Sequence, residues 1–363
     1  MSRIVPAGLL NERGGQVTIE DVIVDAPGPG EVLVRIEATG LCHTDLTARR
    51  DALVFPVVLG HEGAGVVEEV GPGVLSPTVG TPVVLAWKTP CGRCPSCRRG
   101  RQPWCETPQA TAGPRIHRKR DGADTAPFLR VGSFCRYVVV PADAAVPISP
   151  ALPFSVAALL GCGVATGLGA ALFEVHIEPG MDVAIFGLGG VGLNVAQGAA
   201  MARAGKIIGI DLLEEKLMLA RQFGTTDGVR AGADAVERVR GLTGGRGVDV
   251  AFEVVGHPQI MAQGLDVLAP GGTLALVGAP ARDAAFSFLP RHNMLSLQQV
   301  IRGCVYGACR PALHFPLFAQ WALEGTLKLG ELITVTISSL NEVNDALLDL
   351  QSGQGLRTVL VFQ

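Results

Sequence analysis

The sequence has little that would mark a nucleic-acid-binding or membrane protein. Lysine and arginine number 30 against 33 aspartates and glutamates, so the chain lacks the basic excess of a nucleic-acid partner. Its apolar runs are broken by glycine, proline or charge well before about 18 residues, which predicts no membrane span. The first residues lack the apolar core and cleavage pattern of a secretory signal. We therefore expect a cytoplasmic protein with no nucleic-acid or membrane partner.

Aromatic residues are also scarce, at 5% of the chain, whereas glycine is abundant, with 47 residues. This composition predicts close backbone packing. The 363 residues are too many for a comfortable single core, so we expect two domains with a cleft between them. In a reducing compartment, the nine cysteines are expected to be metal ligands, buried thiols or catalytic groups rather than disulfides.

The residue pattern changes about half-way along the chain. From Gln16 to about Val70, short apolar alternations between glycines and prolines predict antiparallel strands of a small β-rich barrel. The polar stretch from Lys88 to about Arg130 should form loops held by something other than hydrophobic packing. From about Gly161, the strand-like runs DVAIFG, KIIGID, VDVAFEVV and GTLALVG alternate with helix-length stretches, which predicts a doubly wound parallel sheet. The part after Cys304 ends in the strand-like RTVLVF, which we expect to return to the first domain.

A glycine-rich turn follows the first strand of the predicted parallel sheet. Gly187, Gly189 and Gly192 have GxGxxG spacing between a strand and a helix. The first glycine permits a tight turn, the second lets the backbone approach a pyrophosphate, and the third lets helix and strand pack closely. Asp211 ends the next strand, where a carboxylate accepts hydrogen bonds from the adenosine ribose and repels a 2′-phosphate. The turn therefore predicts a dinucleotide site that favours NAD over NADP.

Four cysteines are clustered in the polar stretch. Cys91, Cys94, Cys97 and Cys105 have CxxCxxCx7C spacing, so their thiols can converge on one tetrahedral ion. Zinc suits four thiolates, and a closed set without an open position indicates a structural site that supplies folding energy to this lobe. The alternatives are an iron–sulfur cluster, disulfides or free thiols. A reducing compartment and the lack of an evident electron partner favour zinc.

A second set of candidate ligands is dispersed along the chain. Cys42 lies in GLCHTD, His61 and Glu62 in GHEGAG, and Cys162 in LLGCGVATG, each beside glycines. Taken singly, each of them is better explained as a buried cysteine before a turn or a core histidine at a strand edge. Spacing alone cannot join residues so far apart.

These motifs, in this order, resemble the zinc-dependent medium-chain dehydrogenase family, specifically its alcohol dehydrogenase branch. The resemblance runs from PGPGEVLVRIEATGLCHTD to the closing LRTVLVF. It implies an α/β fold with a GroES-like β-rich catalytic domain at residues 1–163 and 306–363, including a zinc lobe at 88–107. A Rossmann NAD-binding domain at residues 164–305 is inserted between its two parts. It also implies two zinc ions per subunit and a homodimer, or alternatively a homotetramer.

The resemblance assigns the catalytic metal to the dispersed set. Cys42, His61 and Cys162 match the zinc ligands, and two cysteines with one histidine is a known ligand set of alcohol dehydrogenases, with one position open to water or substrate. Asp45 matches the acid that orients the ligand histidine, and Glu62 the acid behind the metal. Together they imply an NAD-dependent enzyme in which zinc acts as a Lewis acid on an alcohol.

The resemblance also implies cofactor and substrate contacts. Those to NAD are the turn residues Gly187, Leu188, Gly189, Gly190, Val191 and Gly192, with Val191 and Thr166 beside the nicotinamide, His43 and Arg357 at the pyrophosphate, and Asp211 and Lys216 at the adenosine. The substrate-pocket positions are Trp87, Phe128, Leu129, Ala279 and Val305. This apolar, partly aromatic set favours allylic, aromatic or medium-chain primary alcohols and their aldehydes over polyols.

The resemblance also describes a path for the alcohol proton. Thr44 matches the hydroxyl that passes this proton toward solvent. In several members of the family a histidine ends the relay, but this sequence has Thr47 at that position. Proton release must therefore use water, the ribose hydroxyls or another base.

Other functions stay open at this point. GLCHTDLT and CRRGRQPWC are similar to mycothiol-dependent formaldehyde dehydrogenases, and the basic residues Arg115, His117, Arg118, Lys119 and Arg120 either meet a polar thiol cosubstrate or form a solvated loop. A zinc-free reductase and a purely structural or binding protein are further alternatives, and the intact ligand set and Asp211 argue against both. Cys135, Cys304 and Cys309 are expected to be buried thiols.

Overall fold

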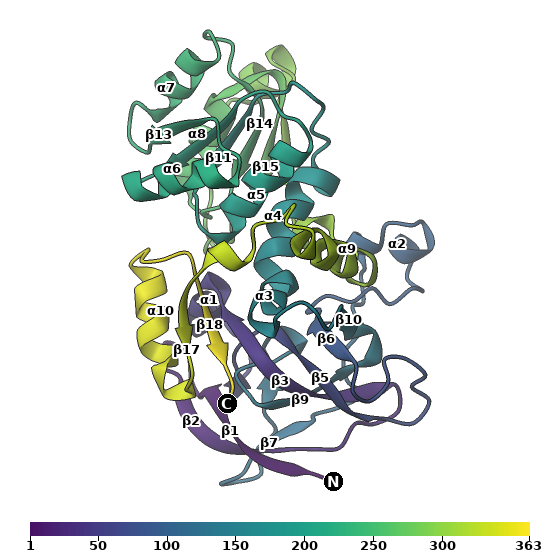
Figure 1. The fold of residues 1–363 in the computed structure, drawn as a ribbon. Coiled ribbons are helices and arrows are strands. Elements are labelled where there is room, and N and C mark those ends of the chain that lie inside the picture. Colours follow the sequence, from purple (N-terminus) through teal and green to yellow (C-terminus); the bar gives the residue numbers. More distant parts are fainter. The chain divides into compact units, whose positions relative to one another are not determined.

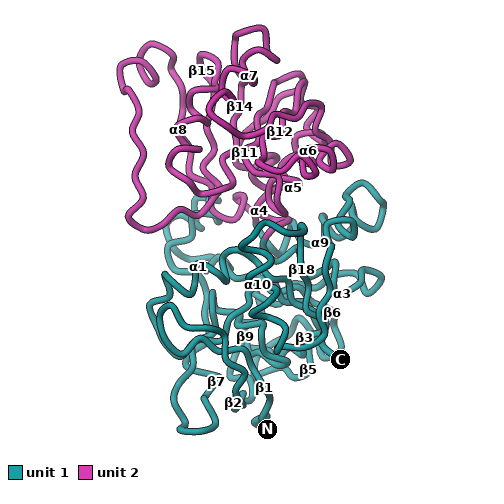
Figure 2. Tube along the Cα trace, turned by 90° about the vertical axis from the view of Figure 1, so that its left-hand side faces the viewer, with its two compact units in different colours: residues 1–162, 310–363 teal, residues 163–309 magenta.

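The computed structural model describes residues 1–363, which form two compact units (Figure 2). Unit 1 comprises Met1–Cys162 and Arg310–Gln363, and unit 2 comprises Gly163–Cys309. The C-terminal residues therefore fold with the first part of the chain, and unit 2 is inserted between them.

Unit 1 contains two β-sheets, drawn in the lower part of Figure 1. The first has the order β7-β2-β1-β4-β8 and the second β10-β6-β5-β3-β18-β17, with β9 also paired to β3. The first sheet consists of β1 (Arg3–Leu10), β2 (Thr18–Val24), β4 (Val57–Val58), β7 (Ile116–Arg118) and β8 (Ala126–Pro127). The second consists of β3 (Glu31–Leu41), β5 (Glu62–Val70), β6 (Pro82–Leu85), β9 (Tyr137–Pro141), β10 (Ala145–Pro147), β17 (Ile333–Ile337) and β18 (Arg357–Val361). These strands confirm the predicted β-rich fold and the return of RTVLVF.

The central strand β3 organises the second sheet. Its apolar residues are buried, and it pairs antiparallel with β5, β9 and β18. The helices of unit 1 are α1 (His43–Asp51), α2 (Pro95–Arg98), α3 (Phe154–Leu159), α9 (Pro311–Leu323) and α10 (Val343–Gln351). Helix α10 places Val343, Ala346, Leu347 and Leu350 in a core with Leu10, Leu41 and Leu59. This spacing is that of an amphipathic helix covering a sheet.

Unit 2 has a six-stranded parallel sheet of order β13-β12-β11-β14-β15-β16, with helices between the strands (Figure 1). The order reverses between β11 and β14, as in a doubly wound dinucleotide-binding fold. Its strands are β11 (Val183–Phe186), β12 (Ile207–Asp211), β13 (Asp227–Arg230), β14 (Val248–Glu253), β15 (Leu268–Leu276) and β16 (Val300–Gly303). Its helices are α4 (Ala165–Gly169), α5 (Gly190–Met201), α6 (Glu214–Ala220), α7 (Ala235–Leu242) and α8 (Pro258–Asp266). The doubly wound sheet is thus confirmed; the two edge strands, β13 and β16, are short and mostly exposed, and periodicity did not reveal them.

One helical stretch passes the length and composition test for a membrane span. It runs from Phe154 to Glu174 through α3, α4 and two π-helical turns, at Leu160–Val164 and Ala170–Glu174. Glycines within it do not end the helix, because close packing compensates for their low helix propensity. The sequence-based expectation that apolar runs are interrupted was therefore too strict. Since 72% of the most apolar window is buried inside the protein, the stretch has the burial of a core helix.

Candidate metal centres and cofactor site

The dispersed candidates of unit 1 meet at one point. Cys42 is the residue before α1, His61 and Glu62 stand at the start of β5, and Cys162 lies in the π-helical turn after α3. The possible ligand atoms of these four residues all lie within 4.8 Å of one another. Cys42 and Cys162 are 7% and 8% exposed, and His61 and Glu62 are fully buried. Four donor groups without an intervening apolar side chain are a geometry suited to a metal ion.

Strand register explains why these residues converge. Gly40 of β3 pairs with Glu62 of β5 on one side and with Val359 of β18 on the other. A side chain at Gly40 would collide with the Glu62 carboxylate and crowd Arg357. Gly40 therefore makes room for the buried ion pair between Glu62 and Arg357. Gly40 precedes Cys42 in ATGLCHTD, but the sequence pattern alone does not indicate its role.

The His61 ring is held for metal binding. Its Nδ1 atom lies 3.1 Å from Oδ1 of Asp45, whereas its Nε2 atom is buried and has no hydrogen-bond partner. Burial lowers the pKa of His61, but the Asp45 carboxylate and the Cys42 thiol raise it well above its ordinary value. The Nε2 atom is buried without a partner, and its surroundings favour a positive charge. These properties fit a zinc ligand, since zinc supplies that charge in place of a proton.

Asp45 fixes three parts of this cluster at once. Besides its contact with His61, its Oδ2 atom accepts a hydrogen bond from the Cys42 amide at 3.1 Å, and its Oδ1 atom accepts one from the Gly60 amide at 3.1 Å. The carboxylate is fully buried. It therefore links α1 to the loop before β5 and orients the imidazole ring, as metal-site acids of this kind do.

The pKa values of the Cys42 and Cys162 thiols are shifted in opposite directions. A hydrogen bond from Cys162, together with His61, lowers the pKa of Cys42 well below its usual range despite burial. The same contact and burial raise the pKa of Cys162. A bound divalent cation would favour the thiolate form of both residues, because a coordinating thiol is deprotonated. Cys42, His61 and Cys162 therefore fit a zinc site.

The ion pair behind this cluster involves Arg357, one of the predicted cofactor residues. Arg357 is 5% exposed and pairs with Glu62, and its Nε atom has no hydrogen-bond partner. Burial raises the pKa of Glu62 to about 7, and Arg357 opposes this shift. The structure therefore brings Arg357 to the metal cluster. Its role at the pyrophosphate stays a prediction.

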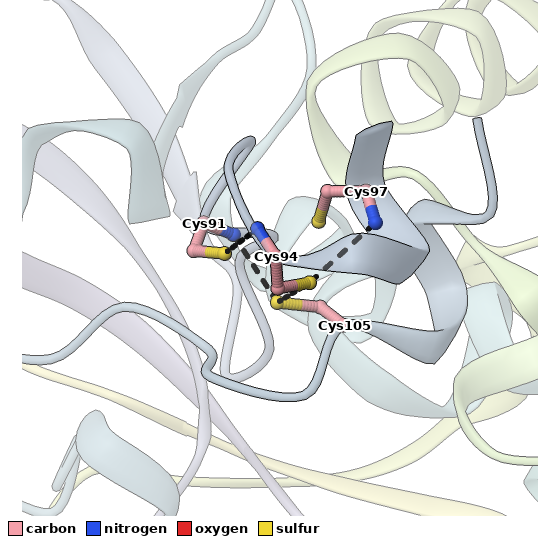
Figure 3. Close-up of side chains that lie close together, drawn as sticks. All are labelled: Cys91, Cys94, Cys97 and Cys105. Carbon is pink, nitrogen blue, oxygen red and sulfur yellow. Dashed lines mark hydrogen bonds between the residues drawn. The ribbon is translucent and has the colours of Figure 1, made fainter. Parts of the chain in front are cut away.

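The four cysteines of the polar lobe also converge (Figure 3). The Cys91 sulfur accepts hydrogen bonds from the Cys94 amide at 3.3 Å and the Thr107 hydroxyl at 3.3 Å, and the Cys105 sulfur accepts one from the Cys91 amide at 3.2 Å. The hydrogen bond from Thr107 and those from backbone amides lower the pKa of Cys91 to about 6. Backbone amides pointing at sulfur are typical of loops that stabilise thiolates.

The lobe has no other core. The buried cluster there consists of Cys94, Cys97 and Cys105, with Cys91 packed against them, and includes no other apolar side chain. Four surrounding arginines, Arg93, Arg98, Arg99 and Arg101, are exposed. Such a segment cannot stabilise itself by hydrophobic burial, so the cysteines fit a structural zinc whose binding energy folds the lobe.

The glycine turn of unit 2 connects β11 to α5. Gly187 has a φ of +97°, which a residue with a side chain rarely adopts. A Cβ atom at Gly189 would meet nothing within 4 Å, so the backbone there is open to a ligand. A Cβ atom at Gly192 would clash with the Gly187 carbonyl oxygen. Each glycine thus has the local property that dinucleotide binding requires of it.

Asp211 closes this cradle at the end of β12. Its carboxylate accepts hydrogen bonds from the amides of Leu188 at 2.8 Å and Leu213 at 3.1 Å. Its side chain remains partly exposed, as does that of Lys216 on α6. The acid is therefore held beside the turn and can still accept hydrogen bonds from a ribose.

The other predicted cofactor residues fall in both units. Thr166 on α4 and Val191 on α5 are partly exposed members of unit 2. Gly167 of α4 lets the two helices pack closely, because a Cβ atom there would lie 2.6 Å from the Asn194 Cβ. His43 is an exposed residue of α1 in unit 1. Their contacts with NAD stay predictions.

Of the pocket residues predicted in unit 1, Phe128 borders the dispersed cluster and Trp87 packs against a hydrophobic core. The Phe128 ring meets the His61 ring edge-on, with centroids 5.7 Å apart. Trp87 is partly buried and packs on the core of the second sheet. Leu129 follows Phe128 with a φ of +47°, an unusual backbone for leucine. Ala279 and Val305 belong to unit 2, where Val305 is 59% exposed.

Thr44 and Thr47 have different neighbours. The Thr44 hydroxyl lies 3.6 Å from the Cys42 sulfur, at the edge of the metal cluster. The Thr47 hydroxyl donates a hydrogen bond to the Thr44 carbonyl at 3.0 Å. Thr47 is therefore engaged with the backbone of α1, whereas the Thr44 hydroxyl faces the cluster.

The basic stretch after the zinc lobe forms β7 and its turn, which pair with β2. Every one of its five basic side chains contacts an acidic one. The contacts are Arg115 with Glu31, His117 with Asp25 and Asp124, Arg118 with Asp121, Lys119 with Asp21, and Arg120 with Glu20. These contacts pair the charges within unit 1, and Lys119 and Arg120 remain exposed to solvent in the turn.

The three cysteines outside the clusters are buried thiols, as expected. Burial raises the pKa of both Cys135 and Cys304 to about 12. Neither belongs to a group of possible ligand atoms that lie close together, which separates them from the metal-binding sets.

Comparison with known proteins agrees with this arrangement. Residues 28–150 match the family described as alcohol dehydrogenase GroES-like domain, and residues 190–324 match the zinc-binding dehydrogenase family. S-(hydroxymethyl)glutathione dehydrogenase of Saccharomyces cerevisiae is 36% identical over 362 residues, covering 95% of this chain and 92% of that protein.

Two solved structures share the whole fold. An alcohol dehydrogenase zinc-binding domain protein from Burkholderia ambifaria has a TM-score of 0.93 and 34% identity, with 100% of both chains covered. Benzyl alcohol dehydrogenase from Acinetobacter calcoaceticus has a TM-score of 0.91 and 29% identity, covering 99% of this chain and 100% of that one. From the two metal-binding clusters, the glycine turn and these similarities, we conclude that the chain belongs to the zinc-dependent alcohol dehydrogenase family of oxidoreductases, with zinc and NAD as its cofactors.

Proposed function

We propose that the enzyme transfers hydride reversibly between NAD and an apolar primary alcohol, of the allylic, aromatic or medium-chain type, giving the aldehyde. The observation that carries this proposal is the Phe128 ring, which lies edge-on to His61 and is partly buried. An aromatic wall beside a metal ligand favours an apolar group next to the reacting carbon.

The metal-site residues have separate tasks in this reaction. Cys42, His61 and Cys162 hold the metal, and Asp45 fixes the orientation of His61 through its 3.1 Å contact. Zinc, when bound, supplies Lewis-acid stabilisation of the negative charge that develops on the substrate oxygen. The buried pair of Glu62 and Arg357 keeps this pocket polar behind the ligands without adding net charge.

Thr44 is the group proposed to handle the alcohol proton. Its hydroxyl lies at the rim of the cluster, 3.6 Å from the Cys42 sulfur. A hydroxyl both accepts and donates a proton, so it can pass the alcohol proton outward as the oxygen becomes negative. Thr47 is committed to the backbone and does not extend this path, so the next acceptor is water or a ribose hydroxyl.

The solved benzyl alcohol dehydrogenase supports the aromatic part of the proposal, since that enzyme is named for a substrate of this class. A second candidate comes from the curated relatives. Three named S-(hydroxymethyl)glutathione dehydrogenase, from yeast, Paracoccus denitrificans and a Synechocystis strain, are 32–36% identical to this chain. Oxidation of a formaldehyde–thiol adduct, such as that of mycothiol, is therefore the alternative function.

The neutralised basic stretch favours the alcohol over the adduct. A thiol cosubstrate of the glutathione or mycothiol type is polar, and charged groups would recognise it. The charges of Arg115 and its four neighbours are instead satisfied within unit 1. The thiol adduct would thus need other cationic groups.

The test is a substrate panel followed by NADH absorbance. Benzyl alcohol, geraniol, hexanol, ethanol and formaldehyde are compared, the last with and without mycothiol or glutathione. Turnover of the bulky alcohols without thiol would support the main proposal. Oxidation of formaldehyde only when a thiol is added would assign the enzyme to the adduct reaction.

We also propose that the protein is a cytoplasmic homodimer. Strand β16 is an edge strand of the parallel sheet, and Val300 on it is 47% exposed. Exposed apolar residues along a sheet edge favour pairing with a second copy. Light scattering on the purified protein distinguishes a dimer from a tetramer or monomer.

A further inference from the structure

A buried acid in unit 2 has no part in the chemistry described so far. Glu253 is the last residue of β14 and is fully buried. Its Oε1 atom accepts hydrogen bonds from the amides of Val255 at 2.9 Å and Gly256 at 2.7 Å. Its Oε2 atom is buried without a hydrogen-bond partner, and no basic side chain forms an ion pair with it. Such a carboxyl is costly to bury, so its retention calls for an explanation.

The same residue also holds the loop after β15. Its backbone carbonyl accepts hydrogen bonds from the amides of Val277 and Gly278, both at 2.9 Å. Gly256 has a φ of +82°, and a Cβ atom on it would lie 2.7 Å from the Ala279 carbonyl carbon. Side chain and backbone of Glu253 thus fasten two loops, residues 254–256 and 277–279, to each other.

The first of these loops packs directly against the glycine turn. A Cβ atom at Gly187 would lie 2.9 Å from Cγ2 of Val255 and 3.2 Å from Cγ2 of Val254. Gly192, at the start of α5, has the same neighbour, with Cγ2 of Val254 at 3.3 Å from an added Cβ. The Val254 amide also donates to the Phe186 carbonyl at 3.1 Å, directly before the turn. A shift of residues 254–256 would therefore move the turn itself.

Burial is the main cause that raises the pKa of Glu253, and the backbone amides and His257 oppose it. The two amides require an acceptor oxygen at this position, and a side-chain amide offers the same oxygen.

We propose that Glu253 is a positioning residue for the dinucleotide cofactor, which fixes residues 254–256 and 277–279 so that the glycine turn is preformed for NAD. This inference concerns the cofactor and does not depend on which alcohol the enzyme oxidises. Preformed loops bind more tightly because less ordering is needed on binding.

The test compares Glu253→Gln, Glu253→Asp and Glu253→Ala in the full, zinc-containing chain, with the dissociation constant for NADH measured by fluorescence. Removal of the acceptor in E253A should weaken NADH binding by about tenfold, because the amides of Val255 and Gly256 lose their side-chain acceptor. E253Q keeps the acceptor oxygen and should stay within about threefold of the natural protein. E253D is one methylene shorter, cannot reach both amides, and should resemble E253A.

A matched control is Glu174→Gln, because Glu174 is a second acid of unit 2, 7% exposed and paired with Arg302. This variant should lower the melting temperature and leave the NADH dissociation constant unchanged. Unchanged NADH affinity in E253A, or equal losses in E253Q and E253A, would overturn the proposal. If E253A does not fold, the NADH dissociation constants of E253Q and E253D are compared instead. Equal NADH affinity in these two variants would also overturn the proposal.

Discussion

The two metal-binding clusters of unit 1 are built in opposite ways. The cysteines of the lobe lie within residues 91–105 and are brought together by one tight loop (Figure 3). The ligands Cys42, His61 and Cys162 come from three distant segments, and strand pairing around β3 brings them together. The first cluster is therefore a property of local sequence, and the second a property of the fold.

The two clusters therefore differ in what positions their ligands. In the lobe, no apolar core exists without the cysteines, so the metal folds the segment. At the dispersed site, buried strands and the Asp45 hydrogen bonds help to position the ligands. Ligands that the fold itself positions can leave one coordination position open for substrate.

The largest expected effect is on activity when a dispersed ligand is removed. Cys162→Ala should lower kcat/KM by at least about a thousandfold, since Lewis-acid catalysis contributes several kcal/mol. Zinc measured by mass spectrometry should fall by one ion per chain, with the lobe still loaded. Cys304→Ala removes a buried thiol outside both clusters and is the control. Full activity in C162A would show that the dispersed cluster is not catalytic.

Thr44→Ala should come next, with turnover nearly abolished and zinc content unchanged. Loss of a positioned proton-transfer group costs roughly 100- to 10,000-fold in rate. Thr47→Ala removes a neighbouring hydroxyl that bonds only to the backbone and should keep close to full kcat. Near-normal kcat in T44A would refute the proton-relay role.

Asp45→Asn probes how far the fold holds the dispersed ligands. The variant should weaken zinc affinity by about 10- to 100-fold, because His61 loses its charged partner. A chelator competition monitored by residual activity measures this change. If D45N retained zinc as tightly as the natural protein, the strands alone would suffice to position His61.

Cys97→Ser should affect stability more than chemistry. Loss of one ligand opens the lobe, so limited proteolysis should cut first within residues 88–107. The fraction that stays folded should keep its kcat within about twofold, because no dispersed ligand is changed. A fall in the kcat of the folded fraction well beyond twofold would mean that the two clusters are coupled, which the comparison does not predict.

The smallest effect is expected at the pocket wall. Phe128→Ala should lower kcat/KM for benzyl alcohol by about tenfold, the range that an apolar pocket contact contributes. The kcat/KM for ethanol, which is too short to contact the Phe128 ring, should fall less. Equal losses for both alcohols would place Phe128 in support of His61 rather than in substrate recognition.

Sequence patterns could predict the parts that depend on local residues. The GxGxxG turn, the buried strands β11, β12, β14 and β15, and the four-cysteine lobe all follow from short-range spacing. The dispersed cluster needed a family resemblance, because nothing in the spacing of Cys42, His61 and Cys162 indicates that they meet.

Other features follow from tertiary contacts that periodicity does not record. The exposed edge strands β13 and β16 lack an apolar pattern. The pairing of Arg357 with Glu62 depends on the register of β18 and on the absent side chain of Gly40. The ion-paired strand β7 looked like a basic loop because its acidic partners on or beside β2 lie about 100 residues away in sequence.

The most direct test of the account is anomalous diffraction at the zinc absorption edge from crystals of the natural protein. We expect two peaks per chain, one among Cys91, Cys94, Cys97 and Cys105 and one among Cys42, His61 and Cys162. A peak in the lobe alone, in an active preparation that turns over alcohol with NAD, would contradict the assignment of the dispersed cluster as the catalytic metal centre.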